Sequence, residues 1–276
     1  MFETGSESGY VVVKVGSNVV TRSVEDTDRK TRIDRNVMEN IAQDISTVMN
    51  GKGHKVILVS SGAVAAGREH IVMPENIDPI AKKQALAAVG QPVLMQEWAR
   101  FFSTAHPSRL TSQHLLTWSD FDSVTRSGNI AGAFHALPDS VVPIVNENDP
   151  VATEELKLGD NDQLAADIAR LMKAKFLVLL TDVDGVFDKN PSEPGAQLIE
   201  QIDAATLTPD FIKSLGIGAS TNGTGGMASK LSAAKKATSA GITTFIANGK
   251  KEGTLTTIAK GGKTGTRLEG LGRMKA

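Results

Sequence analysis

"VVVKVGSN", residues 11–18, places an apolar run directly before a glycine and two small polar residues, and a lysine interrupts the run. Similar apolar runs recur at residues 55–59, 141–145, 176–180 and 243–247. Runs that are apolar throughout, rather than alternating with polar residues, are typical of parallel strands covered on both faces. The stretch therefore predicts one strand of a buried parallel sheet.

Helical patterns lie between these runs. Residues with the spacing of one helix face are Val37, Ile41, Ile45 and Val48, and later Leu164, Ile168 and Leu171. Strands that alternate with helices predict a doubly wound α/β sheet. Pro74, Pro79 and Pro92 predict breaks in the middle region, and residues 188–195 form a loop by their turn composition.

Each apolar run leads into small, polar or acidic residues. These segments are residues 16–18, 60–63, 146–149, 181–185 and 248–250. In open α/β sheets ligands bind just outside the carboxyl ends of the strands, so the sequence predicts a ligand site at this shared edge. Buried strands also end in polar turns for purely structural reasons, and this alternative explanation stays open here.

Composition excludes several classes of protein. The chain has 276 residues, its 30 Lys+Arg and 31 Asp+Glu nearly cancel, and aromatic residues make up 4%. Such a balance provides no basic field for nucleic acid or a membrane surface. The N-terminus lacks the order of a secretory signal and no apolar run approaches the roughly 20 residues that span a bilayer. We expect one cytoplasmic domain.

Metal and thiol chemistry are also unfavourable. The chain has no cysteine, which excludes disulfides and thiolate catalysis. Its five histidines show no metal-ligand spacing, so we expect no metal site formed by the protein.

The glycine-rich stretch "NGTGGMASKLSAAKKA", residues 222–237, resembles a phosphate cradle. A Walker A loop requires glycine directly before lysine, and a dinucleotide loop must follow a strand, so neither motif fits. What remains is a helix start whose backbone N–H groups favour an anion. Lys230 is disfavoured there by roughly 0.3–1 kcal/mol unless an anion faces it. On its own it is equally well explained as a solvated lysine.

Lys14 and the stretch "GDNDQLAADIARL", residues 159–171, supply the other charges. Lysine is almost never fully buried unless paired, so Lys14 in this run predicts a partner at the shared edge. Asp160 and Gln163 have the spacing of a helix capping box, which leaves Asn161 and Asp162 in the first helical turn. A carboxylate there can orient lysine ammonium groups.

The stretch "NENDPVAT", residues 146–153, adds amide and acid groups. Asn146, Asn148 and Asp149 could hold a polar substrate, and Asp149 suits an ammonium group. Turn chemistry alone would also favour these residues.

Seven stretches, in chain order, together resemble the glutamate 5-kinases of the amino acid kinase family: "VVKVGSNVV", "VSSGAVAAGREH", "AVGQPVLMQ", "VPIVNENDPVAT", "KLGDNDQLAA", "LLTDVDGVFD" and "GTGGMASKLSAAKKA". The resemblance runs from about residue 10 to about residue 268. "LLTDVDG" occurs across the wider family, whereas "SSGA" with "GREH", "NEND" and "GDND" indicate the glutamate branch.

The resemblance implies a three-layer αβα sandwich with a mainly parallel central sheet, formed by an amino acid kinase domain over residues 8–268. Residues 269–276 would be a disordered tail or a non-native remnant. The implied activity is ATP-dependent phosphorylation of the γ-carboxylate of L-glutamate to L-glutamyl 5-phosphate, the first step of proline biosynthesis. Mg²⁺ would be carried mainly by the nucleotide.

The resemblance also assigns roles to individual residues. Lys14 and Lys230 would stabilise the transferred phosphoryl group, and Asp162 would organise both lysines. The glutamate site would consist of Ser61, Asp149 and Asn161. The ATP site would consist of Lys14, Gly16, Ser17, Thr181, Asp182, Thr224, Gly225, Gly226, Met227, Ala228, Ser229 and Lys230.

This sequence departs from the family pattern at a few positions, and some expected properties depend on the resemblance alone. Many bacterial members carry a C-terminal PUA domain, and we expect a form without it. Phe187 and Pro150 stand where tyrosine and alanine are common, which we expect to affect loop stiffness. The family implies feedback inhibition by L-proline, delivery of the product to a glutamyl-phosphate reductase, and a homo-oligomer, either dimer or tetramer.

Two alternatives stay open. The chain could be another family member that acts on aspartate, acetylglutamate, carbamate or UMP. It could also be a non-catalytic nucleotide or amino-acid sensor, although the presence of Lys14, Asp162 and Lys230 argues against that.

Overall fold

The computed structural model describes residues 9–23, 31–152, 161–215 and 226–270. These residues form an eight-stranded sheet in the order β5-β6-β4-β1-β7-β9-β10-β8. The strands are β1 (Tyr10–Val15), β4 (Lys55–Ser60), β5 (Leu110–Leu116), β6 (Val141–Glu147), β7 (Phe176–Thr181), β8 (Gln201–Ile202), β9 (Thr243–Asn248) and β10 (Thr266–Leu268). A two-stranded hairpin of β2 (Thr21–Ser23) and β3 (Thr31–Ile33) is separate from it.

The five predicted strands are confirmed, and they form the parallel part of the sheet together with β5. β10 runs antiparallel to β9, which makes the sheet mainly rather than wholly parallel. β5, β8 and β10 were not predicted. β5 has the sequence LTSQHLL, whose polar residues hide the strand pattern, and the other two are only two or three residues long.

β1 lies at the centre of the sheet, between β4 and β7. Its side chains alternate between the two faces: Val11 and Val13 belong to one apolar cluster and Val12 to the other. All three are at most 2% exposed, as expected for a strand that is covered on both sides. Lys14 shares the face of Val12 because side chains two residues apart in a strand point the same way.

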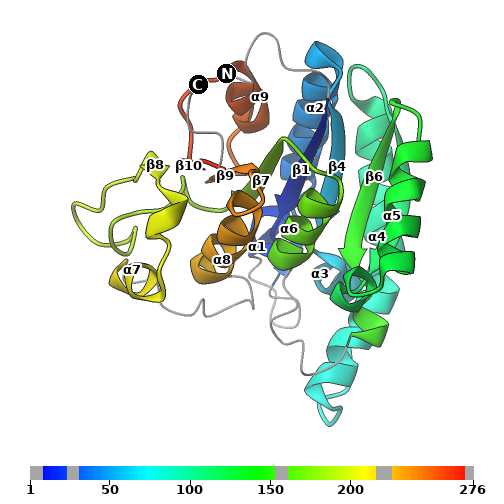
Figure 1. Ribbon diagram of the computed structural model, residues 1–276. Coiled ribbons are helices and arrows are strands. Elements are labelled where there is room, and N and C mark those ends of the chain that lie inside the picture. The colour runs from blue at the N-terminus through cyan, green and yellow to red at the C-terminus, as the bar shows by residue number, and fades with distance from the viewer. Residues whose placement is uncertain (1–8, 24–30, 153–160, 216–225, 271–276) are drawn as a thin grey trace.

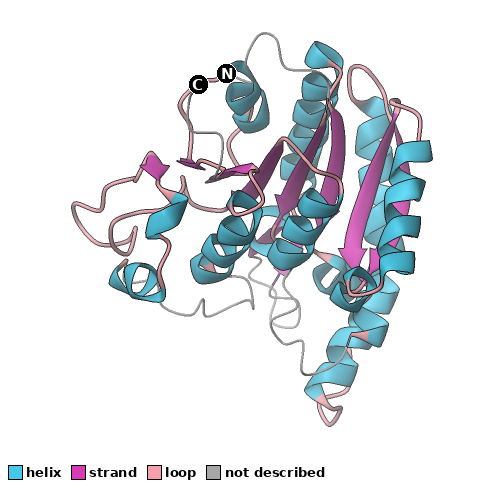
Figure 2. Ribbon diagram, in the orientation of Figure 1, coloured by secondary structure: helices cyan, strands magenta, loops and turns pink. Residues whose placement is uncertain are grey.

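Helices cover both faces, so the predicted three-layer αβα sandwich is confirmed (Figures 1 and 2). The Val11 face packs against α2 (Arg35–Lys52), α3 (Ala63–His70), α4 (Pro79–Thr104) and α9 (Thr254–Lys260). The Val12 face packs against α5 (Val124–Ala136), α6 (Asn161–Leu171), α7 (Pro209–Ser214) and α8 (Met227–Thr238). A short helix, α1 (Ser17–Val20), follows β1 directly.

The predicted break at Pro92 is wrong. α4 runs through Pro92, and its start is set by the carboxylate of Asp78, which accepts hydrogen bonds from two backbone N–H groups of the first turn. Proline removes the N–H of one helical bond and its ring crowds the carbonyl four residues earlier, and the packing of the long apolar face of α4 outweighs this cost. Pro79, in contrast, occupies the first helical position, where proline is favoured.

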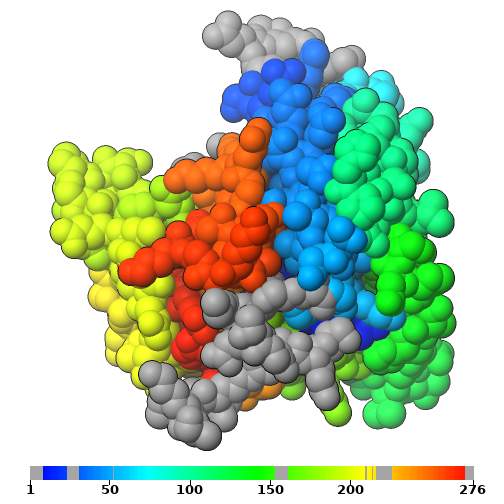
Figure 3. Space-filling model, turned by 90° about the horizontal axis from the view of Figure 1, so that it is seen from above, coloured from blue at the N-terminus to red at the C-terminus, as the bar shows by residue number. Residues whose placement is uncertain are grey.

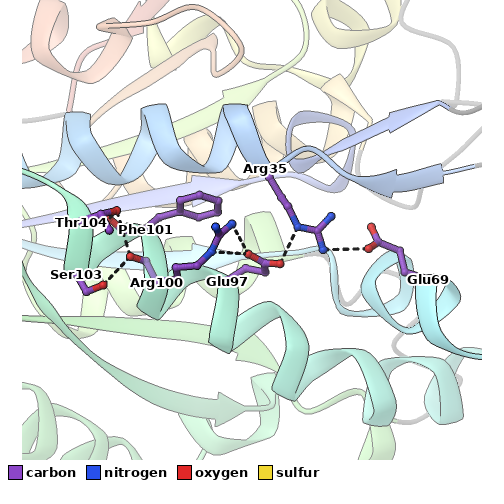
Figure 4. Close-up of polar contacts among 7 residues, drawn as sticks. All are labelled: Arg35, Glu69, Glu97, Arg100, Phe101, Ser103 and Thr104. Carbon is purple, nitrogen blue, oxygen red and sulfur yellow. Dashed lines mark hydrogen bonds and ion pairs between the residues drawn. The ribbon is translucent and has the colours of Figure 1, made fainter.

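α3 and α4 cross very closely. A Cβ atom at Gly90 would lie 1.9 Å from the carbonyl oxygen of Ala63, so only glycine fits at this crossing. Figure 4 shows the charged side of the same assembly, where Arg35 of α2 pairs with Glu69 of α3 and Glu97 of α4 at 3.1 and 2.7 Å. Burial would raise the pKa of Glu97, but hydrogen bonds from Arg35 and Arg100 lower it overall.

The face where the parallel strands begin is seen in Figure 3, with α9 in orange against α2 in blue. Asp44 of α2 accepts a hydrogen bond from the backbone N–H of Leu255 at 2.9 Å and so caps the start of α9. No helix among the described residues is long and apolar enough to cross a membrane. Of the predicted tail, the structure describes Glu269 and Gly270, and Arg267 pairs with Glu269 at 2.8 Å.

Candidate active site

Two lysines and one aspartate meet at the edge where the parallel strands end. Nζ of Lys14 lies 2.6 Å from Oδ1 of Asp162, and Nζ of Lys230 lies 3.2 Å from Oδ2 of the same carboxylate. The three residues are 2%, 0% and 5% exposed. The carboxylate of Asp162 thus contacts both lysines, and Lys230 is buried rather than solvated.

The fold explains why these charges meet. Lys14 comes from the end of the central strand, whereas Asp162 and Lys230 lie in the first turns of α6 and α8, which pack side by side. The partial positive charge of a helix N-terminus favours Asp162 and disfavours Lys230. The negative charge of Asp162 therefore offsets the unfavourable interaction of Lys230 with the start of its helix. Together the three side chains carry one more positive than negative charge, which suits an anion.

The end of β1 brings backbone groups to the same place. A Cβ atom at Gly16 would lie 3.4 Å from Nζ of Lys14 and 3.8 Å from the carbonyl oxygen of Leu180. Gly16 is buried, whereas the next residue, Ser17, is exposed at the start of α1. Gly16 directly follows β1 and Thr181 is the last residue of β7, so these two predicted ATP residues lie at the ends of neighbouring strands.

The remaining predicted ATP residues lie around this edge. The hydroxyl of Thr181, which is 7% exposed, donates to Asp182 at 3.2 Å. Gly226 is the N-cap of α8, and Met227, Ala228 and Ser229 form its first turn with Lys230. Thr224 and Gly225 lie outside the described residues, as does Asp160, the predicted helix cap.

An amide cluster lies beside the charges because Asn161 directly precedes Asp162. Nδ2 of Asn161 donates to Oγ of Ser61 at 2.7 Å and to Oδ1 of Asn146 at 2.9 Å. Ser61 follows β4 and Asn146 is near the end of β6, so three separate elements contribute. The structure thus brings together Ser61 and Asn161, two of the three predicted glutamate residues.

Asp149, the third of them, lies in a short 3₁₀ helix (Asp149–Val151) directly after β6. Burial raises the pKa of its carboxyl group to about 6, although the positive charge of Lys83 acts in the opposite direction. Burial destabilises the charged form of this carboxyl group, and a ligand cation would stabilise that form again.

Two parts of this edge were not identified from the sequence as site residues. Gln91 of α4 accepts a hydrogen bond from Nδ2 of Asn146 at 2.8 Å. Asp184 accepts from Nδ2 of Asn248 at 2.9 Å and pairs with Lys251 at 2.7 Å, which links the turns after β7 and β9. Gln91 gave no local signal because it lies within an ordinary helical pattern. For Asp184, Asn248 and Lys251, the available sequence signal was the position of Asn248 at the end of an apolar run.

Comparisons with known proteins agree with this architecture. The profile of the amino acid kinase family matches residues 9–248. The glutamate 5-kinase of Caldanaerobacter subterraneus subsp. tengcongensis is 40% identical over 93% of this chain and 66% of its own length. That of Salmonella arizonae is 42% identical over 95% of this chain and 69% of its own. The chain thus spans about two thirds of the length of these curated relatives.

Solved structures share the fold at low sequence identity. Carbamate kinase from Giardia lamblia bound to AMP-PNP superposes with a TM-score of 0.64 at 19% identity, covering 95% of this chain and 98% of that one. UMP kinase from Bacillus anthracis gives 0.63 at 12% identity, covering 96% and 98%. With the family profile matching most of its length, the chain belongs to the amino acid kinase family.

Proposed function

We propose that this protein transfers the γ-phosphoryl group of ATP to the γ-carboxylate of L-glutamate and forms L-glutamyl 5-phosphate. The observation that carries the proposal is the buried Lys14–Asp162–Lys230 cluster beside the amide cluster of Ser61 and Asn161. The similarity to curated glutamate 5-kinases at 40–42% identity supports the choice of acceptor.

On the acceptor side, Ser61, Asn161 and Asp149 bind glutamate. Hydroxyl and amide groups suit its carboxylates, and Asp149 suits its ammonium group. The raised pKa of Asp149, about 6, supports this role, because an ammonium partner favours the charged form that burial disfavours.

On the nucleotide side, the ATP phosphates lie between the end of β1 and the start of α8. Gly16 and Ser17 offer backbone N–H groups there, and Thr181, Asp182 and residues 224–230 complete the site. Within the described residues there is no group of three or more His, Cys, Asp or Glu that could hold a metal ion. In this proposal Mg²⁺ is carried mainly by the nucleotide, where it would neutralise charge on the phosphates.

The reaction needs positioning and charge stabilisation more than an activated nucleophile. A γ-carboxylate oxygen of glutamate forms a bond to the γ-phosphorus, and the bond from that phosphorus to the bridging oxygen of ADP breaks. Lys14 and Lys230 stabilise the negative charge on the transferring group. By pairing with both lysines, Asp162 holds their ammonium groups beside the transferring phosphoryl group.

The acyl phosphate product can be trapped chemically, which gives a direct test. Purified protein with ATP, Mg²⁺, glutamate and hydroxylamine should form glutamyl hydroxamate, with ADP released in step. Parallel reactions with aspartate, acetylglutamate, carbamate and UMP identify the acceptor. Turnover of aspartate without turnover of glutamate would overturn the assignment, and no turnover with any acceptor would favour a sensor.

The same proposal includes a partner enzyme, a feedback inhibitor and an oligomeric state. The product is a labile acyl phosphate, which supports transfer to a glutamyl-phosphate reductase in the cytoplasm. L-proline carries the same α-carboxylate and a cationic nitrogen, which supports inhibition at the acceptor site. Leu110 and Leu115 on edge strand β5 are 68% and 38% exposed, which supports a homo-oligomer, either dimer or tetramer.

A further inference from the structure

Gln91 and Asn146 form a buried hydrogen bond behind the acceptor residues. Oε1 of Gln91 accepts from Nδ2 of Asn146 at 2.8 Å, and the two residues are 8% and 3% exposed. Gln91 comes from α4, on the far side of the site from the lysines, and it has no direct contact with Ser61 or Asn161 among the hydrogen bonds described above.

One backbone group fixes the direction of every side-chain hydrogen bond in this cluster. The N–H of Glu147 can only donate, and it lies 2.9 Å from Oδ1 of Asn146 and 3.3 Å from Oδ1 of Asn161. Both amide oxygens must therefore face this N–H. The NH₂ group of Asn146 is left to face Gln91, which has to present its oxygen.

The same reasoning fixes the state of Ser61. With its oxygen on Glu147, Asn161 has only donors left, and these reach Oδ1 of Asn146 and Oγ of Ser61. Oγ of Ser61 therefore accepts a hydrogen bond from Asn161. Its own hydrogen is then free to point in another direction, because a hydroxyl group has one donor and two acceptor positions.

We propose that Gln91 is a positioning residue for the acceptor site. The N–H of Glu147 sets the direction of the amides of Asn146 and Asn161. By accepting from Asn146, Gln91 holds that side chain in place and so keeps the Ser61 hydroxyl as a donor to an anionic ligand. This inference rests on the proposed function for the identity of that ligand, the carboxylate of glutamate. A hydrogen bond to an ionised carboxylate is stronger than one to a neutral amide oxygen, so a donor at Ser61 favours the carboxylate.

The packing of α4 explains how one helix residue reaches this position. Gly90, next to Gln91, lies against the backbone of Ala63, two residues after Ser61. Further along the same helix, Nε1 of Trp98 donates to Oγ of Ser60 at 2.8 Å, and that hydroxyl donates to the carbonyl of Ser61 at 2.9 Å. α4 thus holds both the backbone and, through Asn146, the side chain of Ser61.

The experiment compares Gln91→Leu with Gln91→Glu. Leucine has a similar size but no acceptor, so the buried NH₂ group of Asn146 loses its partner and the side chain is held less firmly against the N–H of Glu147. We expect the KM for glutamate to rise about tenfold or more while the KM for ATP stays within twofold. Glutamate at position 91 keeps an oxygen facing Asn146 in either protonation state, so its KM for glutamate should stay within about threefold of wild type.

Matched controls separate positioning from general damage. Gln96→Leu removes an exposed glutamine from the same helix and should change neither KM. In a Ser61→Ala background, Gln91→Leu should add little, because its effect acts through the Ser61 hydroxyl. Thermal unfolding of each variant shows that the protein is folded, and Gln91→Met replaces Gln91→Leu should the latter fail to fold.

Two results would overturn the inference. One is a wild-type KM for glutamate in Gln91→Leu, and the other is an equal rise of both KM values that persists in the Ser61→Ala background. Wild-type protein that turns over a different acceptor instead would refute the proposed function alone, and the same comparison on that acceptor would still test Gln91.

Discussion

Two lysine–aspartate pairs join α6 to α8, and they differ chiefly in burial. Lys230 and Asp162 form the inner pair at 3.2 Å, with side chains 6% and 0% exposed. Lys236 and Asp167 form the outer pair at 2.6 Å, with side chains 33% and 14% exposed. The outer pair has the shorter contact. Each carboxylate also meets a second cation: Asp162 lies 2.6 Å from the buried Lys14, whereas Asp167 lies 3.7 Å from Arg170, whose side chain is 51% exposed.

The difference shows what each pair contributes. Removing two charges from water costs several kcal/mol per ion, so a buried pair is weak evidence for stability and is often replaceable by apolar residues. The inner pair is therefore better explained by the proposed function, which places the transferred phosphoryl group beside it. The outer pair keeps much of its hydration and serves as a modest tie between the two helices.

The largest contrast should appear when each carboxylate is removed. Asp162→Asn leaves two buried ammonium groups without their shared counter-charge, so the free energy of unfolding should fall by about 3–5 kcal/mol. Asp167→Asn should lower it by only about 0.2–1 kcal/mol. Urea unfolding of both variants measures the difference. Equal losses would show that burial does not separate the two pairs.

Activity should separate the two lysines nearly as strongly. Lys230→Met keeps an apolar stem of similar length but loses the ammonium group, so kcat for glutamyl hydroxamate formation should fall by roughly 10²–10³. Lys236→Met removes a lysine from the same helix and should leave kcat within about twofold. Steady-state kinetics decide between these outcomes, and normal turnover of Lys230→Met would remove this lysine from the proposed mechanism.

Asp149 can be compared with these two carboxylates. The charge that acts on it among the described residues is that of Lys83, through a Coulombic interaction. Burial raises its pKa to about 6, so the carboxyl group is protonated below that pH and must lose its proton to bind an ammonium group. The apparent KM for glutamate should therefore rise about tenfold for each pH unit below about 6, and stay level above about pH 7.

KM values for glutamate between pH 5 and pH 8 test this, with the KM for ATP as the internal reference. Asp149→Asn should raise the KM at pH 7.5 and abolish the dependence on pH. Its effect on folding has a defined sign: the raised pKa means that ionisation opposes folding, so the variant should gain relative stability as pH rises from about 4 to about 6. A pH profile unchanged in the variant would exclude Asp149 as the titrating group.

The sequence predicted those features whose signal is local. Continuous apolar runs identified five parallel strands, and Lys14 within one of them required a partner because a buried lysine is rarely unpaired. Asp162 remained after the capping pattern had accounted for Asp160. The edge strand β5 escaped because it is only partly covered and so lacks an apolar run. α4 continues through the predicted break at Pro92 because tertiary packing outweighed the missing hydrogen bond and the steric cost of the proline ring.

Long-range polar contacts could not be predicted in the same way. Gln91 and Asn146 are separated by 55 positions, and nothing near either residue indicates the other. Their orientation follows from a backbone N–H that becomes a fixed reference only when β6, α6 and α4 are packed together. The hydrogen-bond directions in this cluster follow from simple donor and acceptor rules, but these rules apply only once the fold has brought the residues together.

The smallest expected effect concerns salt. A double-mutant cycle on Lys236 and Asp167, with Lys236→Met and Asp167→Asn, should give a coupling energy of about 0.2–1 kcal/mol at low ionic strength. Raising NaCl from about 0.1 M to about 1 M shortens the Debye length from about 10 Å to about 3 Å, so most of that coupling should vanish. The same cycle on Lys230 and Asp162 should be insensitive to salt, since ions do not enter a site at 6% and 0% exposure. A salt-insensitive coupling above about 2 kcal/mol at the outer pair would mean that it, too, acts as a buried pair, and that the distinction between the two must rest on the position of Lys14 instead.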